Sequence, residues 1–389
     1  MKKRFWLPLG GVVFLGAAFA FRHPLFPALG DSPAGVRAER IVTLPMYRDG
    51  RLRNELPLEE SLAAVGRAIM GERATASRPE TMLEFTATPI PEEISALAVS
   101  WLGHSTVVVD VDGTRVIFDP MFGERAAPVS FAGPERYLKT PLSLAAVGQV
   151  DAVVISHDHY DHLDMAAAQQ LAAAGARFVV PVGIGARLEG WGISEEQVTE
   201  LSWWEAASVG TLQVTSTPAR HFSGRDATDR FSTLWSGWAL IGPTHRVMFT
   251  GDTGMGPHFA EIKERLGPFD LTMPEVGSYD PAWPDVHLGP EQALAAHRIL
   301  ESRYLLPVHW GAFVMGNHSW TEPGERLLMA ATPADGLLLP APGERIDFTV
   351  DDAALPGTPW WPETPFRTAE QTPIISTGLA GTTARNGRP

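Results

Sequence analysis

The pattern of apolar and polar positions divides this chain of 389 residues into unlike parts. An uncharged apolar run covers residues 5–21, directly after Lys2, Lys3 and Arg4. In residues 57–70, apolar side chains recur at spacings of three and four, which predicts an amphipathic helix with one buried face. Short apolar runs separated by polar and glycine-containing segments follow from about residue 95, and they indicate a domain with several buried strands.

We expect four segments on this basis. Residues 1–21 predict a signal peptide or an uncleaved membrane anchor, because a basic start precedes an apolar core and Ala18-Phe19-Ala20 suits cleavage. Residues 22–94 form an N-terminal extension with the amphipathic helix, and residues 95–348 form the main domain. Residues 349–389 are a Pro/Thr/Gly-rich tail that we expect to run extended and to end in disorder. The chain is therefore predicted to be exported, either periplasmic or anchored and facing the periplasm.

Turn and cap residues locate elements within the main domain. Asp112-Gly113 predicts a two-residue hairpin turn, and the second strand of that hairpin ends at Asp119. A helix is predicted over residues 165–174, because Asp164 can cap its first turn and Gly175 can close it in a left-handed conformation. Further runs indicate strands at 151–155, 212–217, 247–250 and 304–308, and a helix that begins near Pro290.

The segment SHDHYDHLD at 156–164 places three imidazoles and two carboxylates within six positions. Alternate residues leaving a strand point the same way, so His157 and His159 can bind one ion while Asp161 and His162 reach a neighbouring ion. Imidazole and carboxylate ligands favour divalent ions such as Zn²⁺. Chance clustering of surface histidines is the alternative, but a strand before and a helix after the segment favour a metal-binding loop.

Two ions need more ligands than this loop supplies, and three further polar residues stand at the ends of apolar runs. His221 follows 212–217, Asp252 follows 247–250, and His309 follows 304–308. Gly251 and Gly254 flank Asp252 and Thr253, and they let the Asp252 carboxylate approach an ion closely. Each of these residues alone would more often be a cap or a core residue. Together with the first motif they form a candidate ligand set.

The order H-x-H-x-D-H, then His, Asp and His resembles the metallo-β-lactamase-fold hydrolases. A closer resemblance, over about residues 95–345, is to the N-acyl-phosphatidylethanolamine-hydrolysing phospholipase D family. It rests on WLGHST at 101–106, FDP at 118–120, LSWWE at 201–205, TLWSGW at 233–238, GPFDL at 267–271, HLGPEQA at 287–293 and VHWGAF at 308–313. The resemblance implies an α/β protein, a four-layer αβ/βα sandwich with two mixed β-sheets and a binuclear site at one edge.

The same resemblance implies roles for individual residues. Two Zn²⁺ per chain are expected, with other divalent metals possible, and a hydroxide held between the ions would be the nucleophile. One ion would be bound by His157, His159 and His221, the other by Asp161, His162 and His309, with Asp252 bridging. Asp161, Asp252 and His287 are the candidate catalytic residues, and His104, His287 and Tyr160 are the candidate substrate contacts.

Some of these residues have a second possible role. His104 and His287 each either contact a substrate phosphate or orient a ligand, and His287 is favoured as the direct contact because it stands on a loop. Tyr160 either forms a wall of the pocket or packs against the following helix. Asp119 either supports the site from behind or makes an ordinary hydrogen bond at a strand end. Among the twelve tryptophans, Trp235 and Trp238 are expected in the core, and a further group could line an apolar groove: Trp203, Trp204, Trp283 and Trp320.

Composition narrows the possible partners. The net charge of −14 argues against nucleic-acid binding, which relies on basic surfaces. The chain has no cysteine, so disulfides and thiolate ligands are excluded. The resemblance implies a phospholipid substrate at a membrane surface and a possible homodimer.

The resemblance thus implies a phosphodiesterase of phospholipase D type, which would convert N-acyl-phosphatidylethanolamine or a related phospholipid to phosphatidic acid and an N-acylethanolamine. A metal-dependent lactonase or sugar-phosphate hydrolase is the alternative enzyme, because a related family branch is similar around residues 103–106 and in the metal motif. A non-catalytic envelope protein stabilised by metal is the alternative of another class.

Overall fold

The computed structural model describes residues 26–59, 66, 74–348 and 355–379. The expected export segment lies outside these residues, as does most of the expected helix at 57–70. Within the described part of the chain, no helix has both the length and the apolar character needed to cross a membrane.

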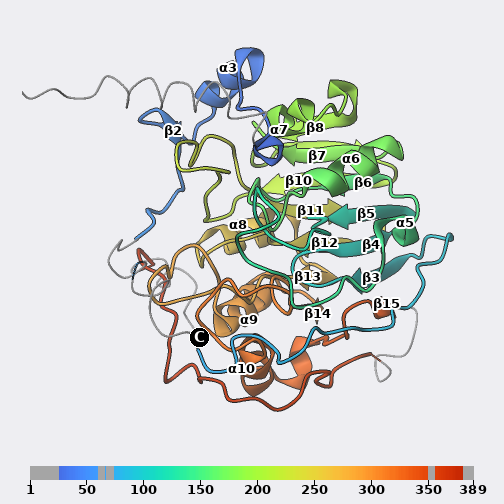
Figure 1. The fold of residues 1–389 in the computed structure, drawn as a ribbon, viewed down its shortest axis with the longest axis vertical. Helices are drawn as coiled ribbons and strands as arrows, with labels where there is room; N and C mark the ends of the chain where they lie inside the picture. Colours follow the sequence, from blue (N-terminus) through green and yellow to red (C-terminus); the bar gives the residue numbers. More distant parts are fainter. Residues whose placement is uncertain (1–25, 60–65, 67–73, 349–354, 380–389) are drawn as a thin grey trace, which may run out of the picture.

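Two mixed β-sheets form the centre of the molecule (Figure 1). The first has the order β15-β3-β4-β5-β6-β7-β8, with antiparallel pairs from β15 to β5 and parallel pairs from β5 to β8. Its strands are β3 (Leu97–Trp101), β4 (Val107–Val111), β5 (Thr114–Phe118), β6 (Ala152–Val154), β7 (Arg177–Pro181), β8 (Val198–Leu201) and β15 (Arg345–Asp347).

The second sheet has the order β14-β13-β12-β11-β10-β9, antiparallel from β9 to β12 and parallel from β12 to β14. Its strands are β9 (Ala206–Val209), β10 (Leu212–Thr217), β11 (Gly237–Ile241), β12 (Arg246–Phe249), β13 (Leu271–Met273) and β14 (Tyr304–Leu305). β14 is shorter than the predicted strand 304–308, although Val308 still bridges Glu275 in parallel.

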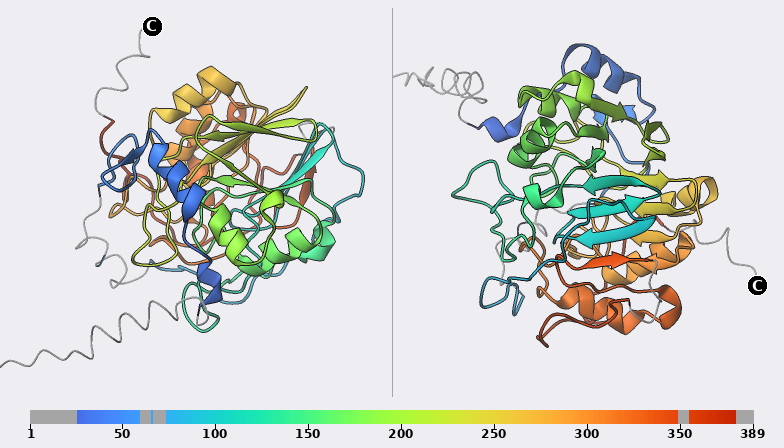
Figure 2. Two further views of the ribbon diagram at one scale, coloured as in Figure 1. Left: turned by 90° about the horizontal axis from the view of Figure 1, so that it is seen from above. Right: turned by 90° about the vertical axis from the view of Figure 1, so that its right-hand side faces the viewer.

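Helices cover the outer face of each sheet (Figure 1, Figure 2). The apolar faces of three helices join one cluster with the outward side chains of the first sheet: α5 (Leu144–Val147), α6 (Met165–Ala173) and α7 (Gly185–Gly190). Three others pack with the second sheet: α8 (His258–Leu266), α9 (Pro290–Ile299) and α10 (Glu322–Ala330). The predicted four-layer αβ/βα sandwich is therefore confirmed.

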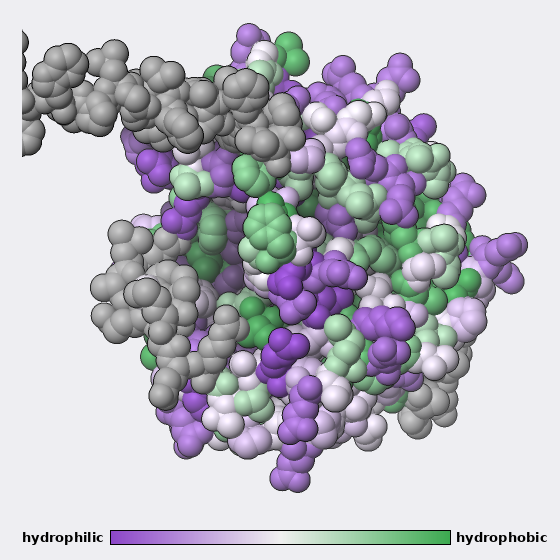
Figure 3. Space-filling view, in the orientation of Figure 1, coloured by the Kyte–Doolittle hydropathy of each residue, from purple (hydrophilic) through white to green (hydrophobic). Residues whose placement is uncertain are grey.

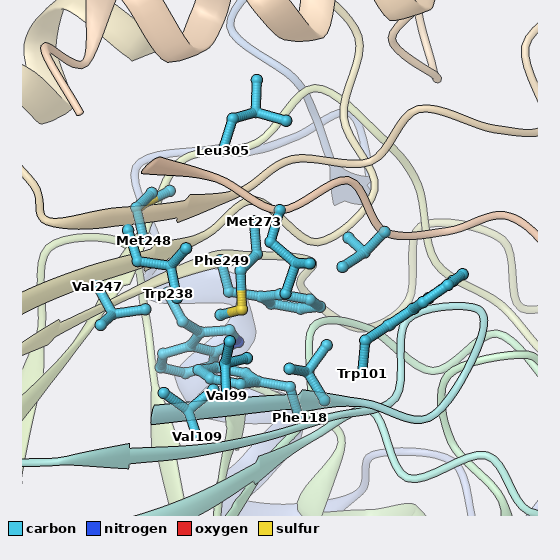
Figure 4. Close-up of a cluster of buried hydrophobic side chains, with 14 of the residues drawn as sticks. Val99, Trp101, Val109, Phe118, Trp238, Val247, Met248, Phe249, Met273 and Leu305 are labelled. Carbon is cyan, nitrogen blue, oxygen red and sulfur yellow. The ribbon is translucent and has the colours of Figure 1, made fainter. Parts of the chain in front are cut away.

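The largest core lies between the two sheets and draws side chains from both (Figure 4). Phe118 of β5 stacks on Phe249 of β12, with ring centroids 4.5 Å apart. Trp238 is fully buried in the same core, and Trp235 is buried in a neighbouring cluster, as predicted. Complete burial of one large apolar side chain contributes about 1.5–3 kcal/mol to the stability of the fold. The many side chains in this layer therefore hold the two sheets against each other.

The predicted local signals also appear in the backbone. Asp112 and Gly113 both have positive φ, 46° and 82°, as a hairpin turn of the predicted type requires. Asp164 caps α6 by accepting a hydrogen bond from the Ala166 amide at 2.9 Å, and Gly175 follows the helix with φ of 87°. The turn joins β4 to β5, and the capped helix α6 joins β6 to β7.

The segments outside the main domain dock on it. The helix α3 (Gly35–Thr43) contributes Ile41 to an apolar cluster with Trp235, and the two-stranded hairpin β1 (Tyr47–Arg48) and β2 (Arg51–Leu52) follows it. Residues 355–379 contain no helix or strand. The tail packs the Trp361 ring edge-on against Trp310, with centroids 5.0 Å apart.

Candidate metal centre

The expected ligands meet at one edge of the sandwich, where strands of both sheets end. His157, His159, Asp161 and His162 follow β6 of the first sheet. His221, Asp252 and His309 follow β10, β12 and β14 of the second sheet. The carboxyl ends of β6, β10, β12 and β14 thus supply the ligands, which is the usual position of ligand sites in sheets with parallel strands.

One group consists of three imidazoles. The Nδ1 atom of His159 lies 2.7 Å from Nε2 of His157 and 3.3 Å from Nε2 of His221. Asp252 Oδ2 lies 3.8 Å from His157 Nε2 and 3.7 Å from His221 Nε2. Three nitrogens and one oxygen therefore surround a common point.

The second group shares the same oxygen. Asp252 Oδ2 lies 3.2 Å from His162 Nε2 and 3.1 Å from His309 Nε2. Asp161 Oδ2 lies 3.3 Å from each of these two nitrogens. Ligands at 2.0–2.1 Å from a tetrahedral zinc are roughly 3.3 Å apart, so these four separations match the edges of such a site.

The hydrogen-bonding state of these atoms agrees with a cation at the centre. His162 donates from Nδ1 to Asp119 at 2.7 Å, which leaves the lone pair of Nε2 facing the carboxylates of Asp161 and Asp252. His162 Nε2 and Asp252 Oδ1 are buried without a hydrogen-bond partner. His162 Nε2 lies 3.2 Å from Asp252 Oδ2, and these two acceptors repel each other unless a proton or a metal ion lies between them. Burial opposes a charge on His162, but Asp252, Asp161 and Asp119 raise its pKa well above the ordinary value, so this position attracts a cation.

Protonation equilibria differ between the two groups. Burial lowers the pKa of His157 and His221 well below the ordinary value, which favours the neutral imidazole that binds metal. Burial opposes charge at His309 as well, but Asp252 and Asp161 raise the pKa of His309 to about 10. The second group thus already contains the negative potential that attracts a cation.

Asp119 supports the centre from behind. This fully buried carboxylate accepts hydrogen bonds from the Ser156 amide at 2.7 Å and from the Ser156 hydroxyl at 2.6 Å, in addition to that from His162. Such carboxylate–histidine–metal contacts fix the orientation and tautomer of the ligand. Of the two readings of Asp119, the supporting role agrees with these contacts.

His104 supports a ligand as well. Its Nε2 atom lies 2.9 Å from Asp161 Oδ2, its exposed fraction is 1%, and burial lowers its pKa to about 3. His104 is absent from the lining of the cavity above the metal ligands. The geometry therefore agrees with its alternative role of orienting Asp161, and the expected substrate contact by His104 finds no support.

Glu275 belongs to the site, and the sequence reasoning missed it. This buried residue follows β13, its Oε2 atom lies 2.7 Å from Nδ1 of His287 and 3.6 Å from Nδ1 of His309, and its Oε1 atom accepts a hydrogen bond from the Thr253 amide. It thus contacts the segments that carry Asp252, His287 and His309. Burial and repulsion from Asp252 raise the pKa of Glu275 well above its ordinary value.

A cavity of about 260 Å³ opens above the ligands. Polar atoms of the metal ligands and of His287 form its floor, and apolar or aromatic residues form its walls: Ala126, Tyr160, Phe222, Trp283 and Met315. Figure 3 shows one face of the molecule, with a hollow left of centre that is bordered by both hydrophobic and hydrophilic side chains. The cavity thus suits a substrate with a polar group beside an apolar part.

The tryptophans expected at the rim separate into different environments. Trp283 lines the cavity. Trp203 packs instead against Trp235, and Trp320 is buried in the core between the sheets with an exposed fraction of 3%. Trp204 stands beneath the Arg265 guanidinium. Only Trp283 among these four, within the described residues, is placed to meet a substrate.

Comparison with known proteins identifies the family. A family model described as the beta-lactamase superfamily domain matches residues 114–310, just over half of the chain and most of the ligand loops. The chain belongs to the beta-lactamase superfamily. Together with the fold and the His/Asp cluster, this membership makes it a metal-dependent hydrolase of the metallo-β-lactamase fold.

Individual proteins resemble the chain more closely than the family model alone indicates. An uncharacterized protein of Mycobacterium tuberculosis is 43% identical over 351 residues, which cover 87% of this chain and 93% of that protein. N-acyl-phosphatidylethanolamine-hydrolyzing phospholipase D 1 of Caenorhabditis elegans is 38% identical over 246 residues, 60% of this chain and 69% of that protein. Among solved structures, isothiocyanate hydrolase from Delia radicum gut bacteria has a TM-score of 0.53 at 21% identity, covering 64% of this chain and 98% of that one.

Proposed function

We propose that this superfamily member is a binuclear zinc-dependent phosphodiesterase of phospholipase D type. The substrate would be N-acyl-phosphatidylethanolamine or a related phospholipid, and the products phosphatidic acid and an N-acylethanolamine. The observation that supports this most directly is the position of Asp252 Oδ2, which is shared by two ligand groups, one of three imidazoles and one of two imidazoles and a carboxylate. The name of the C. elegans relative supports the substrate class.

The ligand assignment follows from the two groups. His157, His159 and His221 would hold one ion, Asp161, His162 and His309 the other, and Asp252 would bridge them. Two zinc ions, when bound, lower the pKa of water so that it can attack phosphorus, and they stabilise charge on the attacking and leaving oxygens. No side chain of the protein is required as a nucleophile.

Residues of the chain would position the phosphodiester. His287 lines the cavity and is held through Nδ1 by Glu275, so its other ring nitrogen is available to a phosphate oxygen or to the leaving alcohol. Tyr160 also lines the cavity, with its hydroxyl donating to the Arg225 carbonyl at 2.8 Å, so its ring rather than its hydroxyl would meet the substrate. Asp161 would stay fixed by His104.

The proposed setting follows from the sequence. The N-terminal segment favours an exported protein, periplasmic or anchored to face the periplasm, and the substrate would then be reached at a membrane surface. The acidic net charge supports the exclusion of nucleic acid as a partner. A homodimer is proposed on the family resemblance alone.

The proposed function is tested by measuring both the metal content of the protein and the identity of its reaction products. Protein purified without added metal is analysed for bound elements, then assayed by mass spectrometry on a phospholipid extract that contains N-acyl-phosphatidylethanolamine. About two zinc ions per chain, with phosphatidic acid and an N-acylethanolamine released, is the expected result. His159→Ala should lose both metal and activity, while His245→Ala, which removes a histidine bonded to Asp112 in a remote hairpin, should lose neither.

Two other outcomes would reject the proposal in different ways. Bound metal with no lipid product, but with turnover of lactones or sugar phosphates, would assign the alternative hydrolase class. Absence of metal and of any hydrolysis would assign a non-catalytic role.

A further inference from the structure

A protruding apolar loop stands at one wall of the metal cavity. Residues 126–134, with the sequence AAPVSFAGP, carry no charge. At the tip of this loop, Phe131 has an exposed fraction of 81%, the highest among the exposed large hydrophobic side chains of the described residues. The right-hand view of Figure 2 shows the sea-green segment to which the loop belongs standing out from the body of the molecule.

The loop is braced at its neck. The Ala126 amide donates to the Pro134 carbonyl at 3.0 Å, and Arg125 bridges Glu135 across the neck. The same guanidinium donates to the carbonyls of Ser130 and Gly133, at 3.0 and 2.9 Å. These contacts hold the loop in one shape, and they satisfy backbone acceptors beside the exposed Phe131.

The base of the loop is part of the cavity. Ala126 is buried in a small cluster with Met121, Leu138 and Phe313, against which Tyr160 and Met315 pack. Ala126, Tyr160 and Met315 also line the metal cavity. A surface that meets the tip of the loop therefore lies next to the entrance through which substrate reaches the metal ligands.

The size of the cavity limits how much of a lipid can enter. Its volume of about 260 Å³ is below the roughly 300–1,000 Å³ of pockets that enclose drug-sized ligands. A phospholipid with long acyl chains cannot fit inside. Only the head group and its phosphodiester can reach the metal ligands, so the chains must stay in the bilayer during the reaction.

We propose that the loop 126–134 docks on a lipid surface and inserts Phe131 into it, so that the cavity opens onto the phospholipid head groups. This inference rests on the proposed lipid substrate. Burial of the apolar surface of an aromatic ring at a membrane interface is favourable in free energy, and a loop without charged side chains has few polar groups to desolvate. Pro128 and Pro134 lack amide donors, and Arg125 binds two of the loop carbonyls, so few backbone groups lose hydrogen bonds to water on insertion.

The charge of the molecule favours a particular kind of surface. A net charge of −14 opposes close approach to an anionic membrane. Attachment through Phe131 requires no charge on the lipid. We therefore expect the loop to insert into zwitterionic phosphatidylcholine vesicles and to insert less well as anionic lipid is added.

The absence of cysteine from the chain makes a direct test possible. The full chain carrying Phe131→Cys is labelled at that single thiol with an environment-sensitive fluorophore and mixed with phosphatidylcholine vesicles. Met329→Cys, on the outer surface of α10 with an exposed fraction of 65%, is the matched control. A blue shift at position 131 but not at position 329 is the expected result. Labels that both stay in water would overturn the proposal.

Activity measurements separate this proposal from the proposed function. Phe131→Ala should lower the rate on vesicles containing N-acyl-phosphatidylethanolamine by about tenfold, as expected from the loss of one buried aromatic anchor. The rate on a small water-soluble phosphodiester should not change, and Met329→Ala should match the wild type on both substrates. If the wild type hydrolyses neither substrate, the proposed function fails; if it hydrolyses both and Phe131→Ala is as fast as the wild type on vesicles, the docking loop alone fails.

Discussion

The Nδ1 atom of His287 lies 2.7 Å from the Oε2 atom of Glu275, a buried side chain that follows β13 and accepts a hydrogen bond from the Thr253 amide after β12. The same oxygen lies 3.6 Å from Nδ1 of the ligand His309. Glu275 therefore links a candidate substrate contact to a candidate metal ligand. It reaches both without lining the cavity itself.

Removal of this side chain should impair the site without unfolding the protein. Glu275→Ala is expected to lower kcat or metal affinity by about 10–100-fold, the usual cost of losing a group that orients a ligand. Glu275→Gln should retain more activity, because its amide group can still form a hydrogen bond with the His287 ring. Steady-state kinetics with elemental analysis of each variant would check this. Equal kcat and metal content in Glu275→Ala and the wild type would contradict it.

Asp119 should determine how tightly the second ion binds. Asp119→Asn weakens the acceptor for His162 Nδ1, and we expect about a 10–100-fold loss of metal affinity. Titration of the apo-protein with zinc by isothermal calorimetry would measure it. Asp151→Asn is the control, because Asp151 accepts from the Arg115 amide at the start of β5, at the end of the sheet away from the ligands. Equal zinc affinities of the Asp119→Asn and Asp151→Asn variants would contradict the supporting role of Asp119.

Removal of metal should destabilise the fold as well as stop the reaction. The ligands come from loops of both sheets, so binding favours the state in which the sheets are together. An ion present at a thousand times its dissociation constant stabilises the folded state by about 4 kcal/mol. Calorimetry with a chelator should show a lower Tm that zinc restores. A Tm that does not depend on chelation would argue against a site shared between the sheets.

Acid stability should depend on a buried ion cluster remote from the metals. Asp110 of β4 accepts from Arg115 Nε at 2.7 Å and from Arg345 Nη2 at 2.7 Å. Burial opposes ionisation of Asp110, but the two guanidinium groups outweigh it and lower the pKa of Asp110. Because the pKa of Asp110 is lower in the folded state than in the unfolded state, its ionisation stabilises the fold. This stabilisation is fully present above the pKa of the unfolded state, which is about 4, and it is lost as the pH falls through the pKa of the folded state.

Substitution of this residue tests the cluster. Asp110→Asn leaves two buried guanidinium groups without a negative partner and should cost about 3–5 kcal/mol at neutral pH. The loss should shrink below pH 4, because the wild type then gives up the same stabilisation. Urea denaturation at pH 7 and pH 3 measures both values. A difference between variant and wild type that is equal at the two pH values would disprove the linkage.

The predictions from sequence succeeded where the structure of a short segment is determined by the residues within that segment. The turn at Asp112-Gly113, the cap at Asp164 and the apolar runs of β10 and β12 depend on neighbours in the chain, and the structure contains all of them. The seven expected ligands also converge, because their strands end at one edge. The family motifs fixed which histidines and aspartates to consider.

The missed and misplaced residues depend on contacts between distant segments. His104 lies 57 positions from Asp161, and only the packed loops bring its ring behind that carboxylate. Trp320 precedes a helix in the sequence, yet its ring is buried beside Trp360 of the tail and Tyr137. Glu275 did carry a signal: it is an acid two residues after the apolar strand β13, much as Asp252 stands three residues after β12.

The division of the ligands between two sheets has a consequence for the choice of metal. Neither group of ligands is complete until the halves have packed, because Asp252 from one sheet must reach histidines carried by the other. Divalent ions compete for imidazole and carboxylate sites according to supply as well as geometry. The compartment in which the chain folds, and the ions available there at that moment, will therefore decide which metal the finished enzyme contains.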